Sequence, residues 1–430
     1  MQNIAIRGGR IVDPLAGRDA VGDLYVVDGR IVARPMEPWD VEIDATGCLV
    51  CPGFIDLHVS FREPGDEKDE TITSGTAAAL AGGFTAVGCF PDSVPAVDNR
   101  AAVEFIQLQT DRAAHCRVLP LGAVTKNRAG AELAEIGQLV EGGAVAFSDG
   151  KQPIANAEIM RRALEYVRMF DRPIFDLPLV PELAGNGVMH EGFHSTLLGL
   201  PGIPAAAEEI MVARDIALAE LTGAHVHLMC LSTAGSVELV RRAKRRGLAV
   251  TADVAVHNLV LDDSAVKSFD SNVKVLPPLR TAEDQAALIE GLRDGTINAI
   301  SADHQPFAEE KKEVEFDQAP FGAIGLETLL PVCVTELIAT GRLSWSDLVR
   351  CLAVRPAEIL RLPAATLEPG SPAAVTVVDP SAEWTVDPDR FFSRSRNTPF
   401  AGRRVKGRVV AVVVDGVLRF APEYDVVPAL

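Results

Sequence analysis

The sequence predicts an α/β protein: a (β/α)8 barrel that carries a small β domain built from both chain ends. From about residue 52 to residue 362, apolar runs of strand length alternate with segments of helical period, the pattern of repeated βα units around a parallel sheet. The apolar runs number eight, as a closed barrel of this type requires. Both chain ends instead carry β-branched runs separated by turn signals.

The predicted barrel strands are short apolar runs bounded by Gly, Pro and polar residues. They cover residues 54–59, 85–90, 117–121, 144–147, 173–176, 224–229, 249–254 and 298–302. Helices are expected between them where apolar residues recur with a period near 3.6, at residues 71–81, 155–170, 206–221, 233–246 and 282–293. Two further helical stretches, 326–339 and 346–352, follow the eighth strand.

The two chain ends resemble each other in pattern. Asp28-Gly29 and Asp415-Gly416 each separate two β-branched runs, and Asp-Gly is a strong signal for a tight hairpin. Two β-rich ends around a different middle predict that residues 1–51 and 364–430 build one composite, sandwich-like β domain. Residues 52–363 then form the barrel.

Composition excludes several classes of partner. The formal net charge of −18 argues against nucleic acids and anionic membrane surfaces, because both need a positive face. Aromatic residues make up only 5% of the chain, which leaves few side chains for stacking on bases. The seven cysteines are scattered, and Cys48 and Cys51 have no second pair to complete a zinc knuckle. With no apolar run of about 20 residues, the chain is expected to be cytoplasmic with reduced thiols.

Polar residues just past the strand ends are the candidate site, because the active sites of such barrels lie at that end. His58 and Ser60 are two residues apart on the first strand, where a metal site would need two ligands such as His-x-His. The other candidate positions are Arg62, Asp92, Asp149, Leu177, Cys230, His257 and Asp303.

Several motifs resemble the dihydroorotase family of the amidohydrolase superfamily. They include Pro52-Gly-Phe-Ile-Asp-Leu-His, Phe147-Ser-Asp-Gly, Ser232-Thr-Ala-Gly-Ser, Ala302-Asp-His and Ala319-Pro-Phe-Gly-Ala-Ile-Gly-Leu-Glu-Thr, in family order along nearly the whole chain. The resemblance implies a metal-dependent barrel that interconverts carbamoyl aspartate and dihydroorotate in pyrimidine biosynthesis.

The resemblance also implies roles for individual residues. His58, Asp149 and Asp303 match metal-ligand positions, and Asp303 is also the catalytic aspartate position. Arg62 matches the residue that grips the substrate carboxylate, whereas Asp92 and His257 match positions near the substrate.

Three ligand positions depart from the family: Ser60, Leu177 and Cys230 stand where active members carry histidine. We therefore interpret the chain as most similar to the non-catalytic dihydroorotase-like subunits, with no cofactor expected. The resemblance implies aspartate transcarbamoylase as its partner in a homo- or hetero-oligomer.

Two alternatives stay open. The first is an active cyclic amidohydrolase with one zinc ion at His58, Asp149 and Asp303, helped by a Cys230 thiolate. The second is a pseudoenzyme that senses a pyrimidine intermediate through Arg62.

Overall fold

The barrel predicted from the sequence is present in the computed structural model, which describes residues 2–34 and 38–422. Eight neighbouring strands follow the order β15-β14-β13-β10-β9-β8-β7-β6, and each neighbouring pair is parallel. A parallel bridge between Val59 and His304 brings the first strand against the segment after the last, so the sheet closes. The strands are β6 (Phe54–Val59), β7 (Phe84–Cys89), β8 (Arg117–Gly122), β9 (Ala146–Ser148), β10 (Ile174–Asp176), β13 (Val226–Leu228), β14 (Val250–Ala255) and β15 (Ala299–Ser301).

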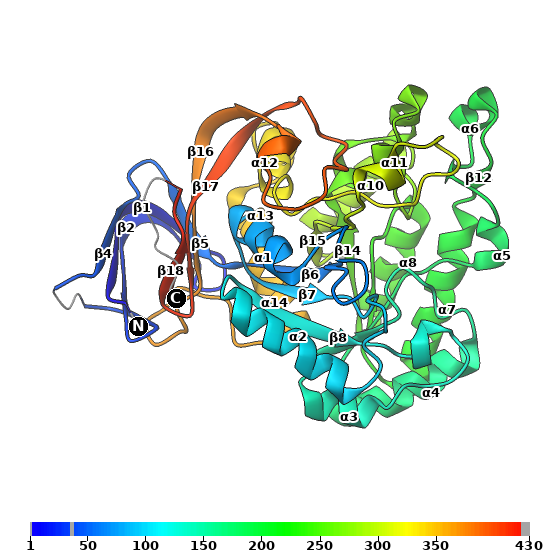
Figure 1. The fold of residues 1–430 in the computed structure, drawn as a ribbon, viewed down its shortest axis with the longest axis horizontal. Coiled ribbons are helices and arrows are strands. Elements are labelled where there is room, and N and C mark those ends of the chain that lie inside the picture. The colour runs from blue at the N-terminus through cyan, green and yellow to red at the C-terminus, as the bar shows by residue number, and fades with distance from the viewer. Residues whose placement is uncertain (1, 35–37, 423–430) are drawn as a thin grey trace.

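Helices surround this barrel, as Figure 1 shows. The five helices predicted with bounds between the strands are confirmed within about two residues at most ends, whereas α2 and α3 were not predicted. The longer helices are α1 (Ile72–Ala81), α2 (Arg100–Ala113), α3 (Ile136–Gly142), α4 (Ala157–Val167), α7 (Ala206–Thr222), α8 (Ala234–Arg245) and α10 (Ala282–Arg293). The shorter ones are α5 (Pro181–Ala184), α6 (Phe193–Leu198), α9 (Val256–Val260), α11 (Glu309–Lys312), α12 (Leu329–Cys333), α13 (Trp345–Val349) and α14 (Arg355–Ile359).

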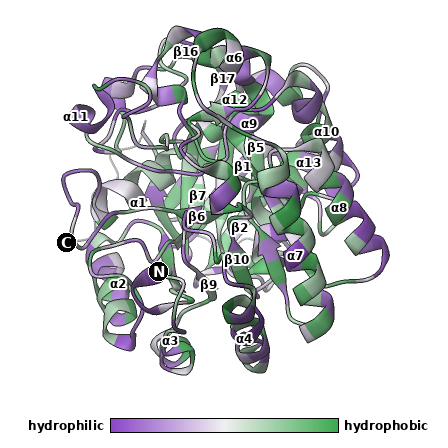
Figure 2. Ribbon diagram, turned by 90° about the vertical axis from the view of Figure 1, so that its right-hand side faces the viewer, coloured by the Kyte–Doolittle hydropathy of each residue, from purple (hydrophilic) through white to green (hydrophobic). Residues whose placement is uncertain are grey.

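Several outer helices are amphipathic, α4 most clearly. In α4 the buried residues recur at helical spacing, whereas the charged residues between them reach solvent: the buried ones are Met160, Ala163, Leu164 and Val167. Figure 2 shows α4, α7 and α8 on the outside of the molecule with hydrophilic and hydrophobic residues in each. Helix starts are fixed locally too, since the Thr71 and Thr281 side chains each accept a backbone N–H of the first turn.

The chain ends share a second sheet, so the predicted β domain from both termini is present. Its strand order is β18-β17-β16-β5-β1-β2-β3, with β4 paired to β1, and both ends lie on the same side of the molecule in Figure 1. Its strands are β1 (Ile4–Asp13), β2 (Arg18–Val27), β3 (Arg30–Val32), β4 (Val41–Asp44), β5 (Leu49–Pro52), β16 (Val375–Thr385), β17 (Arg404–Val414) and β18 (Val417–Phe420). A parallel pair, β11 (Met189–His190) and β12 (Gly202–Ile203), lies outside both sheets.

Both predicted Asp-Gly hairpins are confirmed. Asp28 and Gly29 have φ of 49° and 75°, and Asp415 and Gly416 have φ of 51° and 75°. Positive φ at both central residues is the geometry whose twist matches that of the flanking strands.

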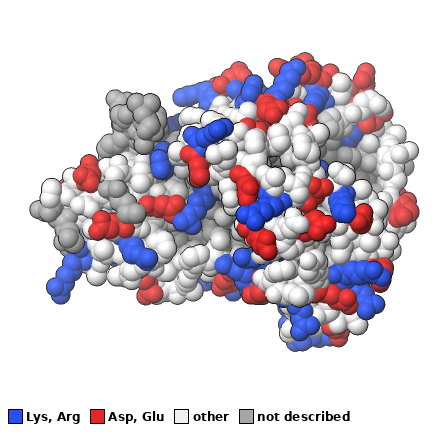
Figure 3. Space-filling view, turned by 60° about the horizontal axis from the view of Figure 1, so that its bottom comes forward, with Lys and Arg blue, Asp and Glu red and all other residues white. Residues whose placement is uncertain are grey.

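The surface is mixed in charge where it is in view. On the face shown in Figure 3, acidic and basic side chains are interspersed. Within the described residues, no helix is both long and apolar enough to span a membrane.

Candidate active site

Three side chains with metal-ligand atoms meet at the mouth of the barrel. His58 belongs to β6, whereas Cys230 and Asp303 follow the ends of β13 and β15. All three are buried, and their ligand atoms lie within 4.8 Å of one another. Cys230 and Asp303 have left-handed backbone conformations, with φ of 52° and 46°. Such conformations are uncommon for residues with a Cβ and concentrate at functional sites.

Lys151, which the sequence analysis did not single out, lies beside this group. It follows β9 and is preceded by Gly150, whose φ is +66°. The Lys151 Nζ lies 2.6 Å from Asp303 Oδ1 and donates to Cys230 Sγ at 3.5 Å and to the Leu276 backbone oxygen at 2.9 Å. A cation supplied by the chain itself therefore lies against the group formed by His58, Cys230 and Asp303.

A second carboxylate holds His58 from the other side. The Asp253 Oδ2 lies 2.9 Å from His58 Nε2 and 2.8 Å from His227 Nε2, and all three side chains are fully buried. The His227 Nδ1 lies 2.9 Å from the Thr251 hydroxyl. The His58 Nδ1 is 3.8 Å from Asp303 Oδ1, so Asp253 is the closer partner of His58.

Charge pairing outweighs burial for several of these groups. Burial alone would lower the pKa of His58, but Asp253 and then Cys230 hold that pKa well above its ordinary value. Burial likewise opposes ionisation of Asp303, yet Lys151 and the neighbouring histidines lower its pKa. For the Cys230 thiol, burial and then the Asp303 carboxylate outweigh Lys151 and His58, and its pKa rises to about 11. Near neutral pH the site therefore holds a protonated thiol and an Asp303 carboxylate paired with ammonium.

Arg62 lies across the barrel mouth in a polar cluster. Its guanidinium donates to Asp92 Oδ2 at 2.9 Å and to Gln305 Oε1 at 3.1 Å. The Ser60 hydroxyl donates to the same Asp92 oxygen at 2.6 Å, and the Phe307 ring lies 4.8 Å from the guanidinium carbon. Arg62 thus pairs with a rim carboxylate, and the negative charge that Asp92 brings to the substrate side is neutralised.

A pocket of about 230 Å³ opens between this cluster and the Lys151 group. Three cations line it, Arg62, Arg128 and Lys151, together with two carboxylates, Asp92 and Asp303. Because the cations outnumber the carboxylates by one, the pocket favours a small anion.

Asp149 does not belong to the group at the mouth. The sequence predicts its carboxylate beside His58 and Asp303, but in the structure Cys230 joins these two residues instead. The Asp149 carboxylate accepts the backbone N–H groups of Val124 at 2.9 Å and Thr125 at 3.0 Å, and the Thr125 hydroxyl at 2.5 Å. These bonds tie the loop after β8 to the loop after β9, so Asp149 has a structural role here.

Leu177 and His257 lie where the strand ends predict them. Leu177 is 2% exposed and lines a small apolar pocket with Cys230 and Leu276, so it adds no ligand beside Cys230. The His257 Nε2 is 3.9 Å from Asp303 Oδ2, and burial lowers the pKa of His257 to about 4, which keeps the ring neutral.

The residues at the mouth fit a divalent metal in type but not in arrangement. Imidazole, thiolate and carboxylate are the ligands that zinc prefers. However, Lys151 places an ammonium against both Asp303 and Cys230. A metal ion bound to Asp303 and Cys230 would lie next to the Lys151 ammonium, and the two cations would repel each other strongly. As placed, this set does not fit a metal ion.

Among the site residues that were missed, Lys151 and Asp253 each carried a weak signal in the sequence. Lys151 directly follows Phe147-Ser-Asp-Gly, so a search two residues further past the strand would have included it. Asp253 is a lone carboxylate inside a predicted apolar strand, and a buried charge of that kind needs a partner.

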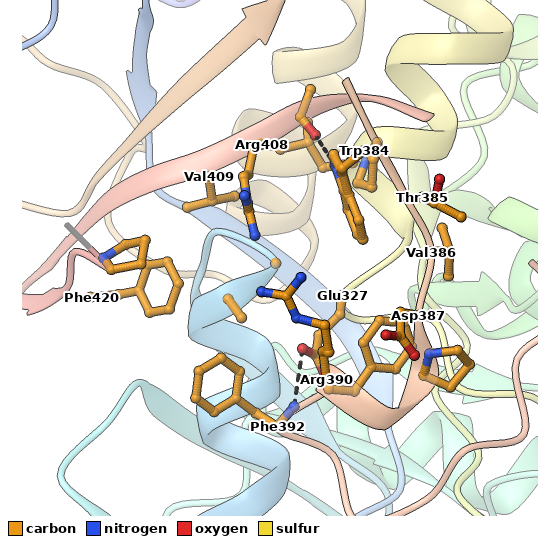
Figure 4. Close-up of a pocket in the computed structure, with 18 of the residues that line it drawn as sticks. Glu327, Trp384, Thr385, Val386, Asp387, Arg390, Phe392, Arg408, Val409 and Phe420 are labelled. Atoms are coloured by element: carbon orange, nitrogen blue, oxygen red, sulfur yellow. Dashed lines mark hydrogen bonds between the residues drawn. The ribbon is translucent and has the colours of Figure 1, made fainter. Parts of the chain in front are cut away.

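A larger cavity of about 810 Å³ lies apart from the mouth and shares no lining residue with the pocket there. Figure 4 shows aromatic side chains, including Trp384 and Phe420, beside Arg390 and Arg408. The Glu327 carboxylate accepts the backbone N–H of Phe392 at 3.1 Å, and burial raises the pKa of Glu327 to about 7.

Known proteins resemble this chain along its length. The family model described as dihydro-orotase-like matches residues 47–236. A dihydroorotase of Pelotomaculum thermopropionicum is 50% identical over 416 residues, covering 96% of this chain and 97% of the relative. One from Syntrophotalea carbinolica is 48% identical over 420 residues, covering 97% and 99%. Among solved structures, an L-hydantoinase from Arthrobacter aurescens aligns with a TM-score of 0.86 at 23% identity, covering 97% of this chain and 96% of its own, which shows the shared fold.

Proposed function

This chain belongs to the dihydroorotase family, and from that premise we propose that it acts on the family's substrate pair, opening and closing the cyclic amide of dihydroorotate. The observation that carries the proposal is the pocket of about 230 Å³ in which Arg62 and Arg128 face Asp303. Carbamoyl aspartate carries two carboxylates, and guanidinium groups bind carboxylates strongly. The site thus combines charge for the substrate with a carboxylate for proton transfer.

The proposed roles follow from the contacts. Arg62 binds a substrate carboxylate, with its guanidinium held in place by Asp92 and Gln305. Asp303, 1% exposed and ionised, accepts a proton when water adds to the ring amide and returns one to the departing nitrogen. The Phe307 ring covers the Arg62 guanidinium and limits its contact with water.

Turnover tests this proposal directly. We expect the purified chain to interconvert dihydroorotate and carbamoyl aspartate, measured by chromatographic separation of the two. Asp303→Asn should lower kcat by about 10²- to 10⁴-fold, the usual contribution of a positioned proton-transfer group. Asp111→Asn is the matched control, because Asp111 is exposed on α2. Absence of turnover by the folded chain would contradict the proposal.

A second candidate is favoured by the contact of 2.6 Å between Lys151 and Asp303, which engages the catalytic carboxylate with the chain's own cation. On this alternative the chain is a non-catalytic family member that associates with aspartate transcarbamoylase and supports its activity. Transcarbamoylase assays with and without this chain, together with co-elution, test it. Unchanged activity and separate elution would rule the partner role out.

A further inference from the structure

Lys151 is held by one ion pair and two hydrogen bonds to groups from three separate segments. They are the Asp303 carboxylate after β15, the Cys230 sulfur after β13 and the Leu276 backbone oxygen. The Lys151 side chain is 19% exposed and that of Asp303 only 1%, so the pair lies well inside the mouth. A lysine fixed in this way has a defined position rather than the freedom of a surface side chain.

That position lies against two of the three groups that could hold a metal ion, Asp303 and Cys230. Zinc lies about 2.0 to 2.3 Å from its carboxylate, imidazole and thiolate ligands. The Lys151 Nζ, at 2.6 Å from Asp303 and 3.5 Å from Cys230, occupies the space that such an ion needs. An ion bound to these two residues would touch the ammonium.

The surroundings suit a resident ammonium better than a metal. The ammonium uses Leu276 as a further acceptor, and a backbone carbonyl is a ready partner for one of its three donors. Leu177 lies against Cys230 and adds apolar volume where another ligand would be needed. A site that holds an ammonium in place of a metal ion thus explains Lys151 together with the absence of the histidines that the family resemblance implies at Leu177 and Cys230.

We propose that the Lys151 ammonium replaces the metal ion, neutralising Asp303 and excluding divalent cations from the His58, Cys230 and Asp303 group. The inference concerns the site of the proposed function, and it implies that any turnover by the wild-type chain needs no metal. Its test measures metal binding alone, so its failure and the failure of the proposed function are distinguishable.

Cobalt(II) titration of the full chain, purified with chelator, tests the inference, because a cobalt–thiolate bond has a characteristic near-ultraviolet absorption. The wild-type chain should show no such absorption. Lys151→Ala should bind one equivalent at least about 100-fold more tightly than wild type, with the thiolate absorption, as expected when a competing charge is removed. Lys151→Arg keeps the charge and should behave as wild type.

Two further variants complete the design. The double variant Lys151→Ala with Cys230→Ser should bind cobalt without the thiolate absorption, which assigns the ligand. Lys151→Gln keeps most of the side-chain volume and replaces Lys151→Ala if the latter does not fold. Stoichiometric cobalt–thiolate absorption in the wild-type chain would overturn the inference. A folded, uncharged variant at position 151 that gains no affinity would overturn it as well.

Discussion

Removing the Asp149 carboxylate should destabilise the protein without weakening cobalt binding by the Lys151→Ala variant. Asp149 accepts three hydrogen bonds, two from the backbone N–H groups of Val124 and Thr125 and one from the Thr125 hydroxyl. Hydrogen bonds to a charged group contribute about 1.5 to 3 kcal/mol each, and a buried donor left unpaired costs about 1 to 3 kcal/mol. Water that enters the space offsets part of this loss, so Asp149→Ala should lower the free energy of unfolding by about 3 to 5 kcal/mol.

Urea unfolding followed by fluorescence and circular dichroism measures this change. Thr125→Val, which removes only the hydroxyl donor, should cost about 1 to 2 kcal/mol. Exposed Asp111→Ala is the control and should change stability by less than about 0.5 kcal/mol. In the Lys151→Ala background, Asp149→Ala should leave cobalt affinity unchanged. A loss of cobalt binding with stability preserved would refute the structural role.

Three further predictions concern charged groups elsewhere. Because burial raises the pKa of Glu327 to about 7, the native state binds more protons than the unfolded state between about pH 4.5 and 7. The free energy of unfolding should therefore fall as pH rises through that window. Urea unfolding at a series of pH values should show a smaller fall for Glu327→Gln than for the wild-type chain. Arg214 lies 3.1 Å from Asp176 and 2.5 Å from Asp215, so Arg214→Met should destabilise by about 3 to 5 kcal/mol in the same assay; a near-neutral result would contradict this. Arg62→Ala should weaken binding of carbamoyl aspartate about 10- to 100-fold by calorimetry, and unchanged affinity would exclude Arg62 from carboxylate recognition.

The sequence pattern was sufficient for the barrel and the terminal sheet. Strand and helix periods, together with Asp-Gly turns such as Asp28-Gly29, are local signals that the tertiary structure did not override. Helix α2 escaped prediction although Asn99 caps it by accepting the N–H of Ala102. Only two of its residues, Val103 and Ile106, are buried, and the helix is hydrophilic on average although its apolar residues lie on one face.

The location of His58, Arg62 and Asp303 at or just past strand ends likewise predicted correctly that they lie at the barrel mouth. It failed for Asp149, because strand position does not say which way a loop carboxylate turns. Here the backbone N–H groups of Val124 and Thr125, in the neighbouring loop, donate hydrogen bonds to it.

Chain order and residue type thus specify the barrel and its mouth. The charge state of the mouth is a property of the folded molecule. A lysine side chain spans four methylenes and several rotamers, so its ammonium can reach many positions from one place in the sequence. The contacts of Lys151 with Asp303, Cys230 and Leu276 exist only because three distant segments converge around it.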